Sequence, residues 1–466
     1  ANQYDYPDDT QSNNIDYRLD YQINNNNSIS YQGGYGINSQ QVDMNHEDII
    51  PTPRTVDNTQ LFQFIKWESV VNAENTLQLQ YYYNLSDKED RYSSAPIVPP
   101  SPIDPFILDV NADIKAERHN LELTHIITPN DSLELSWGLS AQSDQVRSAL
   151  YLYTDEKVTH DQYRAFANIE WHVNQNNIIN LGALVEKNDF SNTEVSPRIS
   201  LTHAFTRQHK IRFGISQAIR SPFIYEALGE QSYSQELTVG GGAPAGLTLL
   251  ENVIRGNRNL ENEKITSHEI AYFGEFLNAS LLFNARLFYD EVSNYIDTLK
   301  ETDPPPSDPS VILYDDVVHV FYNPIDNTTQ GIELEMDYHI DQSLRLIASG
   351  AIININSNSL AMSLSAPQHS FSLLLTKSFN EKYNGSLGYY YVDSFTWTDS
   401  KGICDYNILD IRMSRNFSFD QTYGSLSVAL KNLLGDYSDY NKYPRNSTAP
   451  VVIQNTVAYI DLRLNF

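Results

Sequence analysis

Few residues in this sequence stand in a spacing that supports catalysis. The chain contains no G-x-S-x-G nucleophile motif, no H-E-x-x-H zinc motif and no cysteine and histidine spacing for a metal. Its single cysteine, Cys404, permits no internal disulfide, and His172, His203, His268 and His339 are scattered along expected strands. We therefore predict no catalytic residue, no metal site, no cofactor and no enzyme activity.

Carboxylates form the densest group of potential ligands. In one long segment they are Asp297, Glu301, Asp303, Asp308, Asp315, Asp316 and Asp326. Their spacing is not that of an EF-hand, so a solvated acidic loop is the simpler interpretation and a calcium site the alternative. The formal net charge of −28 argues against nucleic acid as a partner.

A glycine run, Gly240–Gly242, could in principle hold a phosphate group. The Lys and the Ser or Thr of a phosphate-binding loop do not follow it, and no strand-to-helix pattern surrounds it. We interpret the run as the tip of a loop.

The elements that must position these side chains are strands. Ala458, Ile460, Leu462, Leu464 and Phe466 alternate with residues that include Asp461 and Arg463. An apolar side chain at every second position indicates a strand. Ionised groups on the second face and an aromatic last residue are typical of the closing strand of an outer-membrane barrel.

Hydropathy agrees with strands rather than helices as the membrane-crossing elements. Mean hydropathy is −0.43, and no stretch approaches the roughly 18 consecutive apolar residues that a transmembrane helix needs. Tilted strands need only every second residue to be apolar, so a barrel is compatible with this value.

The connections between the expected strands are of two kinds that take turns along the chain. One kind is tight and built from turn formers, as in Asn24–Asn27 and Asn174–Asn177. The other is long and irregular, as in 219–263 and 297–327. Outer-membrane barrels sort their connections in this way, with the short turns in the periplasm.

This pattern predicts an all-β fold, a transmembrane antiparallel β-barrel with about nineteen strands between Asn14 and Phe466. Bacterial barrels have an even number of strands, and three more strands would give the expected 22. We therefore expect residues 1–466 to be one barrel domain that lacks its first strands and any plug domain.

The alternation also predicts which side chains face lipid and which face the lumen. Expected on the outer face are Phe62, Ile169, Trp171, Leu281, Ile332 and Leu464. Expected on the lumen wall are Arg164, Glu170, Arg286, Glu333, Glu335 and Arg463. Mixed charge on the inner wall suits contact with a plug domain, and a water-filled pore is the alternative.

Four segments, in order, resemble the TonB-dependent outer-membrane receptors. Glu194–Leu228 contains SPR at the start of one strand and RSPF after the next, and Gly256–Glu269 reads GNRNLENEKITSHE. Asn323–Glu335 is similar to the start of a strand in that family, and Asn432–Leu434 precedes the terminal Phe466. The departures are Arg258, where the family often has Pro or Asp, and the absence of a plug domain and a TonB box.

The resemblance implies a receptor in the outer membrane of a Gram-negative bacterium. Such a receptor binds a scarce nutrient, most often a ferric siderophore, and imports it to the periplasm with TonB-coupled energy. The implied partners are outer-membrane lipid and lipopolysaccharide, a TonB-type protein acting through the missing N-terminal part, the barrel-assembly machinery acting through Phe466, and a small-molecule ligand. A passive porin and a surface binding or adhesion barrel are the alternatives, and cobalamin, haem and glycans are alternative ligands.

Ligand contacts are expected in the loops, since the strands build the wall. Flat aromatic side chains bury a large apolar area and keep a polar tip, and arginines supply charge for an anionic complex. The candidates are Arg220, Tyr225, Tyr233, Arg255, Tyr314, Tyr322, Trp397, Tyr437 and Tyr440. Arg220 and Tyr225 could instead anchor the loop 219–263. The acidic loops favour a cationic or neutral ligand.

Overall fold

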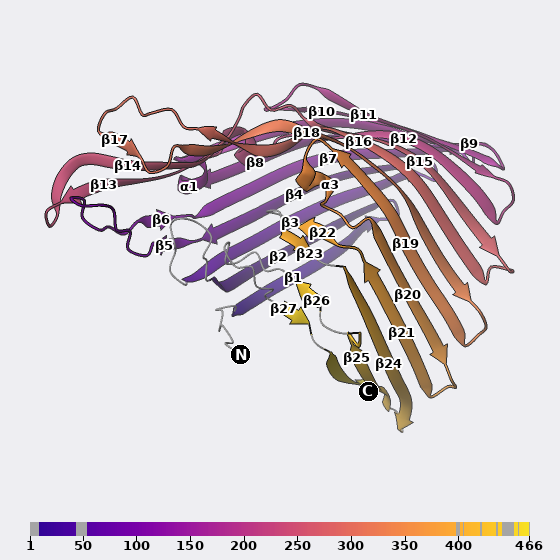
Figure 1. The fold of residues 1–466 in the computed structure, drawn as a ribbon. Helices are drawn as coiled ribbons and strands as arrows, with labels where there is room; N and C mark the ends of the chain where they lie inside the picture. The colour runs from indigo at the N-terminus through magenta and orange to yellow at the C-terminus, as the bar shows by residue number, and fades with distance from the viewer. Residues whose placement is uncertain are drawn as a thin grey trace.

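The computed structural model describes residues 9–42, 54–397, 401–403, 405–419, 422–434, 437–439, 452–454 and 456–465. Most of this part of the chain belongs to one large antiparallel sheet, which curves into a wall (Figure 1). The predicted all-β fold is therefore confirmed.

Nineteen strands form the wall, and each pairs antiparallel with the next one in the following order. They are β1 (Thr10–Asn24), β2 (Asn27–Val42), β3 (Arg54–Asn72), β4 (Asn75–Glu89), β7 (Ile114–Asn130), β8 (Leu133–Ser148), β9 (Thr154–Asn174), β10 (Asn177–Asn188), β11 (Glu194–Ala204), β12 (His209–Arg220), β15 (Glu263–Phe276), β16 (Leu281–Thr302), β18 (Val317–His339), β19 (Leu344–Ser357), β20 (His369–Ser378), β21 (Tyr383–Val392), β24 (Tyr406–Phe419), β25 (Thr422–Lys431) and β28 (Val457–Asn465). This number agrees with the strand count expected from the sequence.

The remaining elements lie in the connections. They are β5 (Arg91–Ser93), β6 (Asp109–Asn111), α1 (Ala149–Leu152), α2 (Ile224–Leu228), β13 (Glu230–Val239), β14 (Ala243–Arg255), β17 (Val311–Leu313), α3 (Leu360–Ser363), β22 (Phe395–Trp397), β23 (Lys401–Ile403), β26 (Tyr437–Asp439) and β27 (Val452–Gln454). In the part of the chain that the structure describes, no helix is long and apolar enough to cross a membrane.

Six short turns of the described wall share one physical device. An Asn or Asp at the end of a strand accepts a hydrogen bond from the backbone N–H two residues later, at 2.6–3.0 Å. This closes the chain without a long loop. The residues that do so are Asn24, Asn72, Asn130, Asn174, Asp341 and Asn380. At Asp341, hydrogen bonds from Ser343 lower the pKa of the carboxyl to about 2. The turn after Asn72 is not among the turns expected from the sequence.

The strand register places the two faces of the wall. Arg118, Asp144 and His160 stand beside one another on β7, β8 and β9, and we call the face that carries them the inner face. Exposed apolar side chains such as Trp171 and Leu334 lie on the opposite, outer face.

The prediction for Phe62 is wrong. Phe62 pairs with Asn84, which pairs with Arg118, so its ring lies on the inner face. The cause is local: β3 carries apolar residues at both parities, Leu61 and Ile65 beside Phe62 and Phe64. Alternation therefore does not define a face in this strand.

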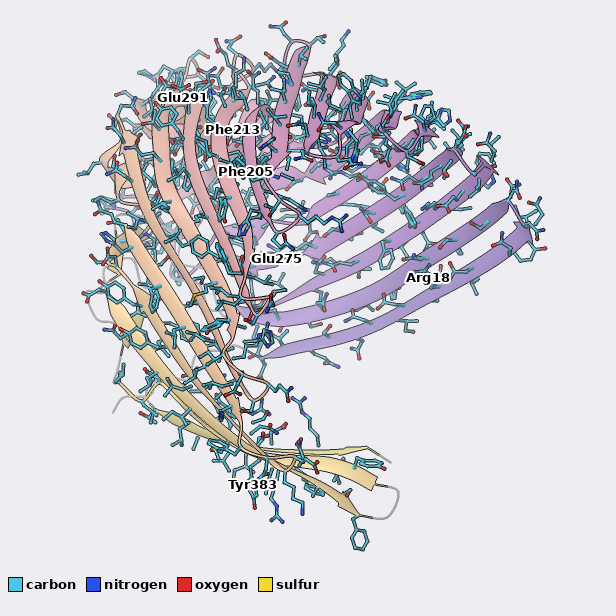
Figure 2. All side chains as sticks on the ribbon, turned by 90° about the vertical axis from the view of Figure 1, so that its right-hand side faces the viewer. Arg18, Phe205, Phe213, Glu275, Glu291 and Tyr383 are labelled. Carbon is cyan, nitrogen blue, oxygen red and sulfur yellow. The ribbon has the colours of Figure 1, made fainter. Side chains whose placement is uncertain are left out.

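The two ends of the described wall are not joined. No pairing links β1 to β28 within the described strands, and Figure 2 shows β1, which carries Arg18, well apart from the yellow C-terminal strands.

The long connections fold together at the end of the wall opposite the short turns (Figure 1). We call residues 90–113, 149–153, 221–262 and 303–316 the loop layer. Its core consists of Leu108, Val110, Ala112, Leu150 and Tyr233. Strands β13 and β14 form a hairpin, and β14 pairs in parallel with β17 and β18. The expectation of irregular loops at 219–263 and 297–327 is wrong, because these segments contain the strands β13, β14 and β17, and Tyr233 of β13 belongs to the core of the loop layer.

Candidate ligand-binding cavity

A cavity of about 1240 Å³ opens on the inner face, where the wall meets the loop layer. Inward-facing residues of β3, β4, β7, β8, β9 and β10 line it, and α1 and the segment 219–225 border it. Five aromatic side chains contribute to its lining: Phe62, Tyr82, Tyr151, Phe223 and Tyr225. Such rings offer large apolar area, and the tyrosines add polar tips.

Two arginines of the cavity are ion-paired with carboxylates on the neighbouring strand. Arg118 Nε lies 2.5 Å from Asp144 Oδ1, and Arg164 Nε lies 2.7 Å from Glu186 Oε2. Glu186 and its neighbour His160 are both buried. These two arginines thus meet the cavity with their charge already paired.

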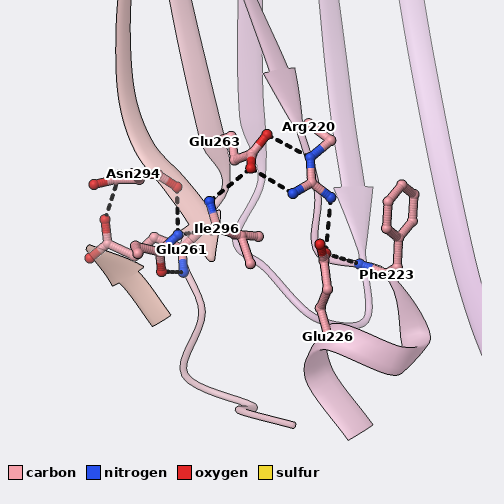
Figure 3. A network of polar contacts seen from close by, with 8 residues as sticks. Arg220, Phe223, Glu226, Glu261, Glu263, Asn294 and Ile296 are labelled. Carbon is pink, nitrogen blue, oxygen red and sulfur yellow. Dashed lines mark hydrogen bonds and ion pairs between the residues drawn. The ribbon is translucent and has the colours of Figure 1, made fainter. Parts of the chain in front are cut away.

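Arg220 is the third arginine of the cavity and holds helix α2 to the wall (Figure 3). Its Nε and Nη2 donate to the two carboxylate oxygens of Glu263 at 2.5 and 2.6 Å. Its Nη1 donates to Glu226 Oε2 at 2.9 Å, and that oxygen also accepts the Phe223 backbone N–H at 2.8 Å. Arg220 therefore joins β12, β15 and α2 at one point.

The segment from Ser221 to Glu226 has a local reason to leave the wall at this point. Pro222 has no backbone N–H for a strand partner and is fully buried. The chain then turns into α2, and the Phe223 ring lies 4.8 Å from the Arg220 guanidinium. The RSPF motif thus contributes to a bracket that holds the loop to the wall. We use this name for Arg220 with its two partners, Glu226 and Glu263.

Two other motif segments meet the same bracket. The Gly256 N–H donates to the Gly229 carbonyl at 2.6 Å, and a Cβ on Gly256 would come within 2.7 Å of the Leu228 backbone nitrogen. Only glycine permits this approach. Asn323 Nδ2 donates to the carbonyls of Asn294 and Glu261 at 2.6 and 3.1 Å. Three motifs that are far apart in the sequence therefore come together at this end of the wall.

Tyr225 stands between the bracket and α1. Its ring packs edge-on against Tyr151 and Phe321, with centroids 5.9 Å apart in both pairs. Its hydroxyl donates to Gln231 at 2.8 Å. Of the predicted ligand residues, Arg220 and Tyr225 are the two that line this cavity.

The other predicted ligand residues lie elsewhere. Tyr233 is 6% exposed in the core of the loop layer. Arg255 pairs with Asp303 at 2.7 Å, and the Tyr322 hydroxyl donates to Glu301. Tyr314 is exposed beyond β17. The side chains of Trp397 and Tyr437, together with Tyr440, lie outside the described residues.

The predicted lumen-wall residues lie on the inner face, where two of them, Arg286 and Glu333, belong to a chain of ion pairs. Glu269 contacts Arg212 at 2.7 Å and Arg286 at 3.2 Å, and Arg286 also contacts Glu333 at 3.0 Å. We call Arg212, Glu269, Arg286 and Glu333 the ion-pair ladder, which crosses β12, β15, β16 and β18.

Three other lumen-wall residues each make a single local contact outside the ladder. Glu335 accepts from Asn284 at 3.3 Å. Glu170 contacts His172 at 3.0 Å, and Arg463 contacts Asp461 at 3.1 Å.

Sequence reasoning missed most of the cavity. Tyr82, Arg118, Asp144, His160 and Glu186 come from five different strands. Alternation assigns each of them to a face, but only the register between strands brings them side by side. In the described residues no group of three His, Cys, Asp or Glu side chains could hold a metal ion.

The glycine run Gly240–Gly242 is the tip of the β13–β14 hairpin, where all three residues have positive φ. The N–H groups of Gly241 and Gly242 donate to the Asp104 carboxylate at 3.0 and 2.9 Å. The glycine run thus binds a carboxylate of the same chain, that of Asp104. These hydrogen bonds, from Gly242 and then Gly241, lower the pKa of Asp104.

This contact predicts a pH-dependent hairpin tip. The ionised carboxylate accepts the bonds, so they are fully formed above the ordinary aspartate pKa of about 3.9 and are lost as pH falls through the lowered pKa. The protection factors of the amides at residues 238–243, taken relative to their intrinsic exchange rates at each pH, should therefore fall in acid. Asp104→Ala should lower these protection factors at neutral pH and remove their pH dependence. Asp109→Ala, which removes a contact to Ser93 in the same loop, is the control and should leave the tip unchanged.

Comparison with known proteins gives one family. A family model described as "TonB dependent receptor-like, beta-barrel" matches residues 1–433. No curated protein sequence matches this chain.

Solved structures share the fold. The siderophore receptor PirA from Acinetobacter baumannii is 13% identical, with a TM-score of 0.69, over 97% of this chain and 70% of that one. A mutant of the ferric enterobactin receptor PfeA from Pseudomonas aeruginosa is 11% identical, with a TM-score of 0.70, over 93% and 66%. The ferric-catecholate import receptor Fiu from E. coli K12 is 10% identical, with a TM-score of 0.65, over 92% and 71%. The chain thus spans about two thirds of the length of these proteins.

Proposed function

The chain belongs to the TonB-dependent receptor-like β-barrel family, and from this premise we propose that it forms the barrel of an outer-membrane uptake receptor. The receptor binds a scarce nutrient and imports it to the periplasm of a Gram-negative bacterium with TonB-coupled energy. We propose a ferric siderophore as this nutrient. Structurally similar proteins are siderophore receptors, which supports this choice of ligand.

The observation that carries the proposal is the cavity on the inner face. It has room for a ligand of several hundred Å³, lies where the loop layer meets the wall, and combines aromatic rings with salt bridges. A ligand that enters from the loop side reaches the cavity before it reaches the rest of the inner face. This placement suits capture followed by inward release.

Further partners follow from the proposal. The apolar outer face contacts outer-membrane lipid and lipopolysaccharide. A plug domain and a TonB box, which a TonB-type protein would pull, are proposed to precede residue 1 in the full protein. Phe466, outside the described residues, is proposed as the signal for the barrel-assembly machinery.

Growth of a deletion strain under iron limitation tests the proposal. With single siderophores supplied, the strain should fail to grow on at least one ferric complex, and the restored gene should rescue it. Unchanged uptake of every ferric complex, with lost uptake of cobalamin or a glycan, would overturn the siderophore and keep the receptor. Uptake that persists after a protonophore has collapsed the proton-motive force would point to a passive porin.

A further inference from the structure

We propose that the cavity selects a ferric complex without net negative charge. This inference rests on the proposed siderophore receptor and names its substrate class. A ferric ion bound by three singly charged hydroxamates is neutral, whereas one bound by three doubly charged catecholates is a trianion. The geometry points to the neutral hydroxamate class.

The first argument is that the cavity's cations are already neutralised. Arg118 pairs with Asp144 at 2.5 Å, and Arg164 pairs with Glu186 at 2.7 Å. Arg220 pairs with both Glu226 and Glu263, at 2.9 and 2.5 Å. Each of the three arginines that line the cavity therefore has at least one carboxylate partner.

The second argument is the cost of receiving an anion at such a wall. A trianion would have to displace carboxylates from these arginines, and each displaced carboxylate would lose its partner in a partly buried place. Left in place, Asp144 and Glu186 would repel the trianion at short range. Residues 1–466 carry a formal net charge of −28, which adds to that repulsion during approach.

The third argument is the rest of the lining. Phe62 and Phe223 give apolar area, and Tyr82, Tyr151 and Tyr225 give rings with hydroxyl groups. Aromatic rings bind a neutral complex through contact area, with no need for opposite charge.

Binding of two probes to the native full-length protein, purified in detergent, tests the inference. Ferrichrome is a neutral ferric trishydroxamate, and ferric enterobactin is a trianionic triscatecholate. We expect ferrichrome to bind at least about tenfold more tightly, which corresponds to about 1.4 kcal/mol, and its affinity to change little with salt. Tighter binding of ferric enterobactin overturns the inference and leaves the uptake receptor standing. Binding of neither complex overturns the siderophore assignment, and the inference with it.

A charge variant tests the cause. The double variant Asp144→Asn with Glu186→Gln leaves Arg118 and Arg164 without their carboxylates. Ferric enterobactin should then bind about tenfold more tightly at low salt, and the gain should shrink as salt screens the charges. Asp337→Asn, which frees Arg345 near the short turns, is the matched control and should leave both affinities unchanged. An equal gain in the control, or no gain in a folded double variant, contradicts the proposed cause of the selectivity.

Discussion

Arg220→Met should release helix α2 from the wall and abolish high-affinity ligand binding. The change leaves the carboxylates of Glu226 and Glu263 without their common partner in a partly buried place. Because Arg220 is about one third exposed, we expect the free energy of local unfolding of residues 221–229 to fall by about 2–3 kcal/mol, less than for a fully buried pair. Hydrogen exchange of those residues measures the loss.

The matched control is Arg18→Met on β1. Arg18 also makes a close ion pair, with Asp20 at 2.8 Å, but its side chain is 63% exposed. Exposed pairs contribute little to stability, so exchange and ligand binding should not change. Slow exchange of residues 221–229 in Arg220→Met would show that helix α2 is held by its apolar contacts instead of by the bracket.

Glu269→Gln should weaken the middle of the wall. Glu269 bonds both Arg212 and Arg286, and it is only 20% exposed. A glutamine keeps one acceptor oxygen and turns an amide NH₂ toward one of the two arginines. Loss of a hydrogen bond to a charged group costs about 1.5–3 kcal/mol, and we expect a decrease of this size in the barrel's unfolding free energy.

Two neighbouring glutamates provide comparisons for the loss of unfolding free energy in Glu269→Gln. Glu333→Gln breaks one contact of the ladder at a more exposed place and should cost less than Glu269→Gln. Glu335→Gln changes only a 3.3 Å contact to Asn284 and should be neutral. Denaturant unfolding in detergent micelles measures all three, and equal effects for Glu269 and Glu335 would contradict a special role for the ladder.

The sequence allows prediction of the wall because period-two alternation is a local property. The Ile332–Ile340 stretch and the strand before Phe466 each reveal their two faces without any knowledge of their neighbours. The family resemblance rests on RSPF, GNRNL and the NPIDNTTQG segment, and the comparisons confirm it. Phe62 shows the limit, because β3 is apolar on both faces and its alternation is ambiguous.

The site could be predicted only in part, because it depends on contacts between distant segments. Arg118 and Glu186 show no motif, and the strand register alone brings them into one cavity. Tyr233 looks like a loop residue in the sequence, yet the loop layer has its own core and buries it. For Arg220 the sequence favours a bracket that anchors the loop over a ligand contact, and the ion pairs with Glu226 and Glu263 form that bracket.

The ion-pair ladder has a mechanical consequence. Each arginine in it is balanced by a glutamate on an adjacent strand, so the wall needs no opposing surface to cancel its charge. A polypeptide or ligand that slides along these strands breaks no strong electrostatic bond to the wall and leaves no bare charge behind. Along these four strands, a surface that moves parallel to the wall therefore separates no ion pair between itself and the ladder.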